Sequence, residues 1–242
     1  MSTHTTPITT PITPETDLAP TFIWIIADAS GSMQHLHSTV IDGLNDFIAE
    51  QATEPGEAKV TAVQFPRKDR DSGIQTILPM SKVRTARRIT AEDYEITGMT
   101  PLYDAIGTVI EKADSRLATR AQQGKPTESQ VVVIFTDGAE NASNRFDRDG
   151  ILSMIEERKS RGWVFVFLGA NLEAFGEGEK VGVAAKNTRM FEATDAGMKD
   201  ALLLTSSALK SYRKKSAAMR MMTADAFFDD VDPAVTSGDD AD

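Results

Sequence analysis

The sequence predicts an α/β fold with a doubly wound, mostly parallel central sheet of about six strands and helices on both faces. Three continuous apolar runs, at residues 22–27, 131–135 and 163–168, are typical of strands that are buried on both faces. Segments with helical periodicity separate these runs, and strands that alternate with helices form parallel sheets through right-handed crossovers.

The first half of the chain predicts three strands and one helix. Residues 22–27 form the first strand, which ends at Asp28. Over residues 33–48 the apolar side chains recur at spacings of three and four, which predicts a helix with one buried face. Residues 58–65 and 74–83 alternate imperfectly between apolar and polar side chains on either side of a charged turn. We expect two neighbouring strands there, one of them an antiparallel edge strand.

The second half of the chain repeats the alternation of helix and strand. A helix is expected over residues 102–117, with Pro101 near its first turn, where a missing N–H is harmless. Another helix, over about residues 148–161, separates the last two apolar runs. A short strand near residues 188–191 and a long helix over residues 195–213 complete the expected order.

The length of 242 residues suits one domain with tails. Residues 1–20 are rich in threonine and proline, which favours a flexible extended arm. Residues 21–216 are expected to form the domain. Residues 217–242 are rich first in methionine and then in aspartate, so we expect a largely disordered tail whose like charges repel. Its methionines either pack back on the domain or form a sticky segment for a partner.

Composition argues against several classes of function. Seven aspartates after Arg220 account for most of the net charge of −10, and the body lacks the basic surface that nucleic-acid phosphates require. The chain has no cysteine, which excludes disulfides and thiolate metal ligands. It also lacks a secretory signal and an apolar run of the roughly 18 residues that a membrane span needs. We therefore expect a cytoplasmic protein that binds neither nucleic acid nor membranes.

Oxygen-bearing side chains collect where two of the expected strands end. Asp28 and Asp137 each terminate a strand, and ligands of open α/β sheets bind beyond the carboxyl ends of the strands. Ser30 and Ser32 follow Asp28 in a loop that leads into a helix, and Thr100 stands just before another helix. We expect these side chains to lie together at one edge of the sheet.

Two carboxylates and three hydroxyls, without histidine or cysteine, are ligands for a hard cation such as Mg²⁺ or Mn²⁺ rather than zinc. Waters and one outside ligand would complete the shell of such a cation. The other interpretation is structural, because serine and aspartate at a strand-to-helix turn commonly cap the helix. Nearby, Asp104 is interpreted as a helix-dipole partner and Asn171 as a turn residue. His35 and His37 are interpreted as solvated or packed side chains.

Three segments of the sequence resemble the metal-ion-dependent adhesion site of von Willebrand factor A (vWA) domains, whose fold is Rossmann-like. They are Asp28-Ala29-Ser30-Gly31-Ser32-Met33, Gly98-Met99-Thr100-Pro101-Leu102 and Phe135-Thr136-Asp137-Gly138, and they occur in the order of the family. The resemblance covers roughly residues 21–213, and residues 162–171 are similar to compact bacterial and bacteriophage members. One departure is Met99, which stands where many members have a second glycine.

The resemblance implies a complete metal site that binds a protein partner. Ser30, Ser32 and Thr100 would contact the cation, directly or in a ligand-dependent way, and Asp28 and Asp137 would act mainly through water. Neutral ligands leave the charge of the metal poorly compensated, so an acidic side chain of a partner can take the open position. Bacterial relatives often work beside an AAA+ ATPase or in stress and phage-encoded systems. Because this chain has no P-loop motif, such an ATPase would be a separate chain.

The resemblance therefore favours a non-enzymatic, cation-dependent protein interaction module. A structural or assembly component with a fold-stabilising metal is the first alternative. A metal-assisted phosphohydrolase is the second, because a cation at the rim of a doubly wound sheet can also polarise a phosphoryl group. Against an enzyme, Ser30 stands where an Asp-x-Asp pair would have its second aspartate, and the sequence has no Gly-x-Ser-x-Gly elbow.

Overall fold

A computed structural model describes residues 18–67, 69 and 73–231. The first part of the expected arm, residues 1–17, and the last part of the expected tail, residues 232–242, lie outside the described residues. The strands are β1 (Thr21–Asp28), β2 (Ala58–Phe65), β3 (Gln75–Lys82), β4 (Ser129–Thr136), β5 (Val164–Gly169) and β6 (Thr188–Met190). They form one sheet in the order β3-β2-β1-β4-β5-β6.

The fold class predicted from the sequence is confirmed. β2 and β3 pair antiparallel at one edge, and the other neighbouring strands pair parallel. The helices are α1 (His37–Thr53), α2 (Leu102–Gln122), α3 (Arg148–Lys159), α4 (Leu172–Lys180), α5 (Asp195–Arg213) and α6 (Ala217–Met222). Short 3-10 helices are η2 (Gly31–Leu36), η3 (Val83–Thr85) and η4 (Ala185–Asn187).

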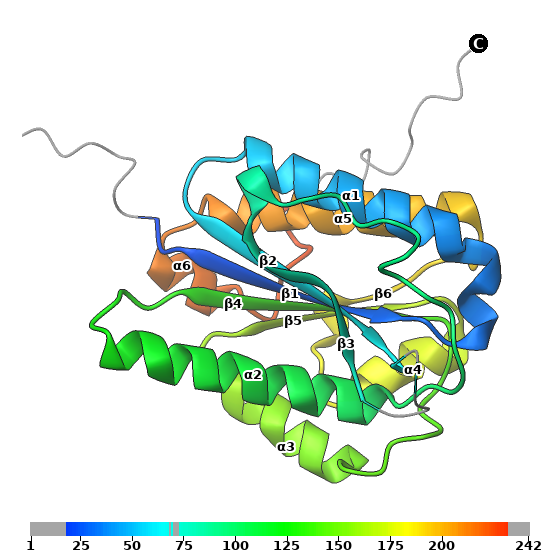
Figure 1. The fold of residues 1–242 in the computed structure, drawn as a ribbon. Coiled ribbons are helices and arrows are strands. Elements are labelled where there is room, and N and C mark those ends of the chain that lie inside the picture. The colour runs from blue at the N-terminus through cyan, green and yellow to red at the C-terminus, as the bar shows by residue number, and fades with distance from the viewer. Residues whose placement is uncertain (1–17, 68, 70–72, 232–242) are drawn as a thin grey trace, which may run out of the picture.

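Helices cover both faces of the sheet (Figure 1). α1 and α5 pack side by side on one face, and α2, α3 and α4 lie on the other. β2, β1 and β4 are parallel neighbours, so their carboxyl ends meet at one edge of the sheet, which is on the right in Figure 1. Among the described residues, no helix combines the length and the apolar composition that crossing a membrane requires.

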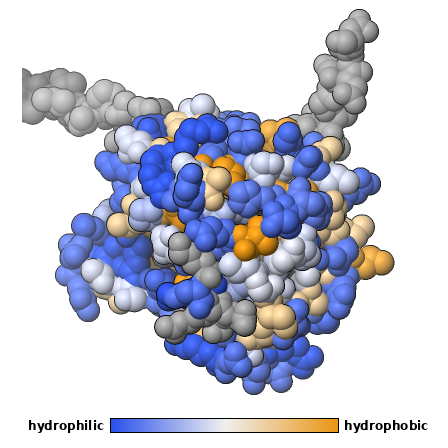
Figure 2. All heavy atoms as spheres, turned by 45° about the vertical axis from the view of Figure 1, so that its right-hand side comes forward, coloured by the Kyte–Doolittle hydropathy of each residue, from blue (hydrophilic) through white to orange (hydrophobic). Residues whose placement is uncertain are grey.

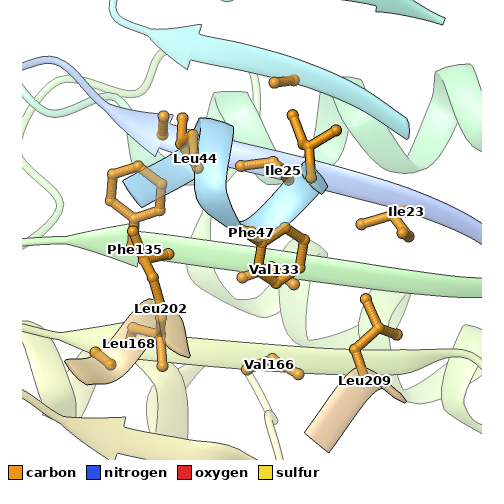
Figure 3. Close-up of a cluster of buried hydrophobic side chains, with 14 of the residues drawn as sticks. Ile23, Ile25, Leu44, Phe47, Val133, Phe135, Val166, Leu168, Leu202 and Leu209 are labelled. Carbon is orange, nitrogen blue, oxygen red and sulfur yellow. The ribbon is translucent and has the colours of Figure 1, made fainter. Parts of the chain in front are cut away.

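β1 is buried along its whole length, as its continuous apolar sequence predicts. Ile23 and Ile25 point toward the helices of one face, where they meet side chains such as Phe47 of α1 and Leu202 of α5 (Figure 3). The alternate residues of β1, Phe22, Trp24 and Ile26, belong to a second apolar cluster on the side of α2 and α3. Two separate cores therefore hold β1 in the middle of the fold.

The chain after residue 216 is packed, which corrects the expectation of a largely disordered tail over residues 217–242. α6 follows α5 closely, and its Arg220 is only 2% exposed. Beyond α6, Phe227 and Phe228 are buried in the same apolar cluster as the inner faces of α1 and α5. The packed structure therefore extends past the expected boundary, up to residue 231.

The aspartates of this stretch are paired rather than simply repelling one another. Asp229 pairs with Lys186 and Asp230 with Lys215, each at a distance of 2.5 Å. Exposed pairs of this kind contribute at most about 1 kcal/mol each, whereas burial of a phenylalanine side chain contributes roughly 1.5–3 kcal/mol. The apolar residues between the aspartates therefore decide the structure of this stretch, and its charge alone was a poor guide.

Helix α4 was not expected from the sequence, because its two glycines lower the helical propensity of a short segment. Asn171 caps it, with its side-chain oxygen accepting a hydrogen bond from Ala174 N at 2.8 Å. The first turn lies directly against the end of β5, since a Cβ atom at Gly169 would come within 2.4 Å of Phe175 N. Only glycine permits this approach of helix to strand.

We expect Gly169→Ala to destabilise the fold by about 2–3 kcal/mol, because the backbone of α4 must move away from β5. Gly176→Ala is the matched control, since it lies in α4 and has open space around it. That change should be neutral or stabilise the helix by up to about 1 kcal/mol. Chemical denaturation measures both variants, and equal free energies of unfolding would contradict the close packing of α4 on β5.

Candidate metal centre

Two central strands deliver the predicted aspartates to the same edge of the sheet. Asp28 is the last residue of β1, and Asp137 follows Thr136, the last residue of β4. The parallel register pairs Ala27 with Phe135, so the two strands end side by side. The juxtaposition of the two aspartates is therefore a direct result of the sheet topology.

Asp28 is fully buried, and each of its carboxylate oxygens accepts a hydrogen bond. Ser30 N donates to Oδ1 at 2.7 Å, and Thr136 Oγ1 donates to Oδ2. Burial raises the pKa of Asp28 to about 7; the hydrogen bonds from Thr136 and Ser30 act in the opposite direction, and the charge of Asp137 adds to the rise.

Two serine hydroxyls connect the aspartates. Ser32 Oγ donates to Asp137 Oδ1 at 2.7 Å, and the Oγ atoms of Ser30 and Ser32 are 3.2 Å apart. Together with the bond from Ser30 N to Asp28, these contacts form a continuous polar chain between the two strand ends. Ser30 is buried and Ser32 is exposed, so the polar chain runs from the interior to the surface.

Thr100 enters the cluster from the loop that precedes α2. Thr100 N donates to Asn141 Oδ1 at 2.8 Å, and Asn141 N donates to Thr100 O at 3.2 Å. Thr100 Oγ1 faces the residue after Asp137, since a Cβ atom at Gly138 would lie 3.3 Å from that oxygen. Gly31 N donates to Gly98 O at 3.3 Å, which joins the loop after β1 to the loop before α2. All the residues that the sequence predicted for the site therefore lie at one rim.

Three further residues support the rim. Thr136 stands in one of the motif segments, Asn171 was interpreted as a turn residue near the same rim, and Tyr94 was not singled out. Thr136 holds Asp28 as described above, and Tyr94 OH donates to the backbone oxygen of Asp28. Asn171 Nδ2 donates to Asp137 O at 2.6 Å, while the same side chain caps α4. The position of Asn171 directly after a buried strand was a usable signal. The sequence held no signal for Tyr94, because its contact depends on the path of a loop.

Asp104 and Glu140 organise the loop behind the rim. Asp104 Oδ1 accepts hydrogen bonds from Arg145 N and Phe146 N, each at 2.9 Å. Glu140 Oε2 accepts one from Tyr103 N, also at 2.9 Å. Asp104 therefore does more than complement the dipole of α2, because it fixes the loop that follows β4. Both carboxylates are therefore engaged by backbone N–H groups, Asp104 by those of the loop and Glu140 by that of Tyr103 at the start of α2.

The donor set at the rim fits a hard divalent cation. The described residues include no group of three or more His, Cys, Asp or Glu side chains that could hold a metal ion. A site at this rim therefore depends on hydroxyl oxygens and waters as well as on the two aspartates. Mg²⁺ and Mn²⁺ accept such oxygen ligands, whereas zinc prefers nitrogen and sulfur. A cation at this rim would also compensate the negative charge of ionised Asp28.

The fold and the rim define a doubly wound α/β domain with a hydroxyl-rich site at the carboxyl ends of its central strands. The sequence model of the von Willebrand factor type A domain matches residues 23–202, and the chain belongs to this family. Domains of the family generally serve as metal-dependent protein interaction modules. No curated protein matches the sequence.

Solved structures with this fold come from proteins of different kinds. Proximal thread matrix protein 1 from the mussel byssus matches with a TM-score of 0.55 and 17% identity over 78% of this chain. The pilus adhesin SpaC from Lactobacillus rhamnosus GG matches with a TM-score of 0.59 and 11% identity over 81%. This chain spans 48% of the former and 30% of the latter. The SpRpn10 VWA domain is covered over 94% of its length, with a TM-score of 0.51 and 12% identity over 76% of this chain.

Proposed function

We propose that this chain is a non-enzymatic interaction module in which a bound divalent cation, Mg²⁺ or Mn²⁺, accepts an acidic side chain from a protein partner. Ser30, Ser32 and Thr100 supply neutral hydroxyl ligands, and Asp28 and Asp137 hold waters of the metal shell. The observation that carries the proposal is the polar chain from Asp28 through both serine hydroxyls to Asp137.

The ligand set favours an acidic partner for an electrostatic reason. Hydroxyl oxygens are neutral, so a cation that they bind directly keeps most of its positive charge. Aspartates that act through water balance this charge only at a distance. A carboxylate from outside is the strongest available ligand for the remaining position of a hard cation. Asp28 and Asp137 thus retain the cation, and the three hydroxyls leave it reactive toward a partner.

We also propose a setting for the module. The resemblance of residues 162–171 to compact bacterial and bacteriophage vWA proteins supports a cytoplasmic role in a bacterial or phage-encoded system. A separate AAA+ ATPase or a component of a stress system is the class of partner that this resemblance favours. Purification of the chain from its source cell, with identification of the proteins that co-purify with it, would test the setting.

Capture of the partner should depend on both the metal and the hydroxyl ligands. With the full chain immobilised in Mg²⁺, we expect partner capture to be lost on addition of EDTA and in Ser30→Ala. Ser153→Ala is the matched control, because Ser153 is an exposed serine of α3 and is not one of the rim residues. Partner capture that survived both EDTA and Ser30→Ala would contradict the metal bridge.

The absence of catalysis is tested with the same proteins. Mg²⁺-loaded chain should leave a panel of phosphate esters unhydrolysed. A hydrolytic rate that depended on the metal and disappeared in Asp28→Asn would contradict the interaction module and support the phosphohydrolase alternative.

A further inference from the structure

Two exposed apolar side chains stand beside the residues of the metal centre. Met99 is 46% exposed and directly precedes Thr100. Leu172 is 79% exposed and directly follows Asn171, whose side chain donates to Asp137 O at 2.6 Å. The two side chains thus come from different segments beside the site, the loop before α2 and the first residue of α4. Apolar side chains exposed at a ligand-binding rim are available to cover apolar groups of a partner.

Met99 is the position at which this chain departs from many vWA domains, which have glycine there. The loop meets its need for a left-handed backbone at Gly98, whose φ is +32°. Position 99 is therefore free to carry a side chain. Methionine is long, flexible and polarisable, and it adapts to partner surfaces of different shapes.

Exposed acidic side chains occur in the segments that border the site. Glu173 is exposed next to Leu172, and Glu192 is exposed in the loop that precedes α5. His35 links that loop to the site, because its ring nitrogens lie 2.8 Å from Ser32 O and 3.0 Å from Ala193 O. Figure 2 turns this side of the molecule toward the viewer and shows isolated hydrophobic side chains among hydrophilic ones.

We infer that the partner presents one acidic residue flanked by bulky apolar side chains, without a second acidic residue beside it. The acidic residue binds the cation, and its apolar neighbours cover Met99 and Leu172. A second carboxylate would be repelled by Glu173 and Glu192, whereas basic residues further out would be attracted. This inference rests on the proposed function, and it adds the composition of the segment that the metal site recognises.

A displayed library of random peptides tests the composition of that segment directly. The full chain is immobilised in Mg²⁺, and bound peptides are released with EDTA. We expect the released pool to be enriched in peptides with a single Asp or Glu next to Leu, Ile, Met or Phe, with Lys or Arg further away. A selected peptide then serves as the probe for variants.

Binding of the selected peptide should weaken about tenfold in Met99→Ser and in Leu172→Ser, because each loses one apolar contact. Met222→Ser is the matched control, since Met222 is 80% exposed on α6 and should leave the affinity unchanged. Mn²⁺ affinity, measured by calorimetry, should be the same in all three variants. A loss of peptide binding with unchanged Mn²⁺ affinity separates the apolar contacts from the metal site.

The outcomes distinguish the inference from the function on which it rests. An EDTA-released pool without apolar preference, or a selected peptide that binds both variants as tightly as the unchanged chain, would overturn the inference alone. A library without any EDTA-released pool would overturn the proposed function and the inference together.

Discussion

Asp28→Asn is expected to weaken Mn²⁺ binding by about 10- to 100-fold and to leave the fold intact. The amide keeps the shape of the side chain and an acceptor for Ser30 N, which bonds to Oδ1 at 2.7 Å. It removes the buried negative charge that retains a cation at the rim. Asp137→Asn should act in the same direction, because it removes the charge of the second carboxylate of the rim. That carboxylate lies next to a hydroxyl ligand, since Asp137 Oδ1 accepts a hydrogen bond from Ser32 Oγ at 2.7 Å. Isothermal titration calorimetry with Mn²⁺ measures both dissociation constants.

Cation binding should also appear as an increase in stability. At a free cation concentration of 100 times the Kd, the free energy of unfolding of the unchanged chain should rise by about 2.7 kcal/mol. The rise should be much smaller in Asp28→Asn at the same concentration. Asp149→Asn is the matched control, because Asp149 is an exposed aspartate in the first turn of α3. An equal rise in Asp28→Asn and in the control would mean that Asp28 does not retain the cation.

The central part of the fold could be predicted because burial on both faces leaves a clear trace in sequence. The runs at β1, β4 and β5 are continuously apolar, and a parallel sheet is the structure that buries such strands on both sides. α4 could not be predicted, because its helical state depends on the cap at Asn171 and on the close approach at Gly169. These contacts exist only after β5 is in place.

The candidate site could also be predicted only in part. Its predicted ligands lie in short motifs at the ends of strands or the starts of helices, so sequence position alone brings them to one rim. The residues that hold them reach in from loops. Asn141 fixes the backbone of Thr100, and Tyr94 contacts the end of β1 across a separation of 66 residues. Long-range contacts of this kind depend on loop paths that no periodicity records.

Arg220→Met should produce the largest loss of stability, about 3 kcal/mol or more in the free energy of unfolding. Arg220 is 2% exposed and donates to the backbone oxygens of Ala19 at 2.7 Å, Lys215 at 3.0 Å and Arg213 at 2.5 Å. It also donates to Ser129 Oγ at 3.1 Å. Methionine supplies similar bulk without donors, so these buried acceptors would lose their partners.

Arg220→Lys separates the charge from the geometry, because lysine keeps a cation but cannot reach several acceptors with one planar group. Its effect should lie between that of methionine and no change. Met222→Ala lies on the same helix with its side chain 80% exposed, and it should change the stability by less than about 0.5 kcal/mol. Urea unfolding measures all three variants. If Arg220→Met cost no more than Met222→Ala, then α6 would be weakly attached and the stable domain would end near residue 216.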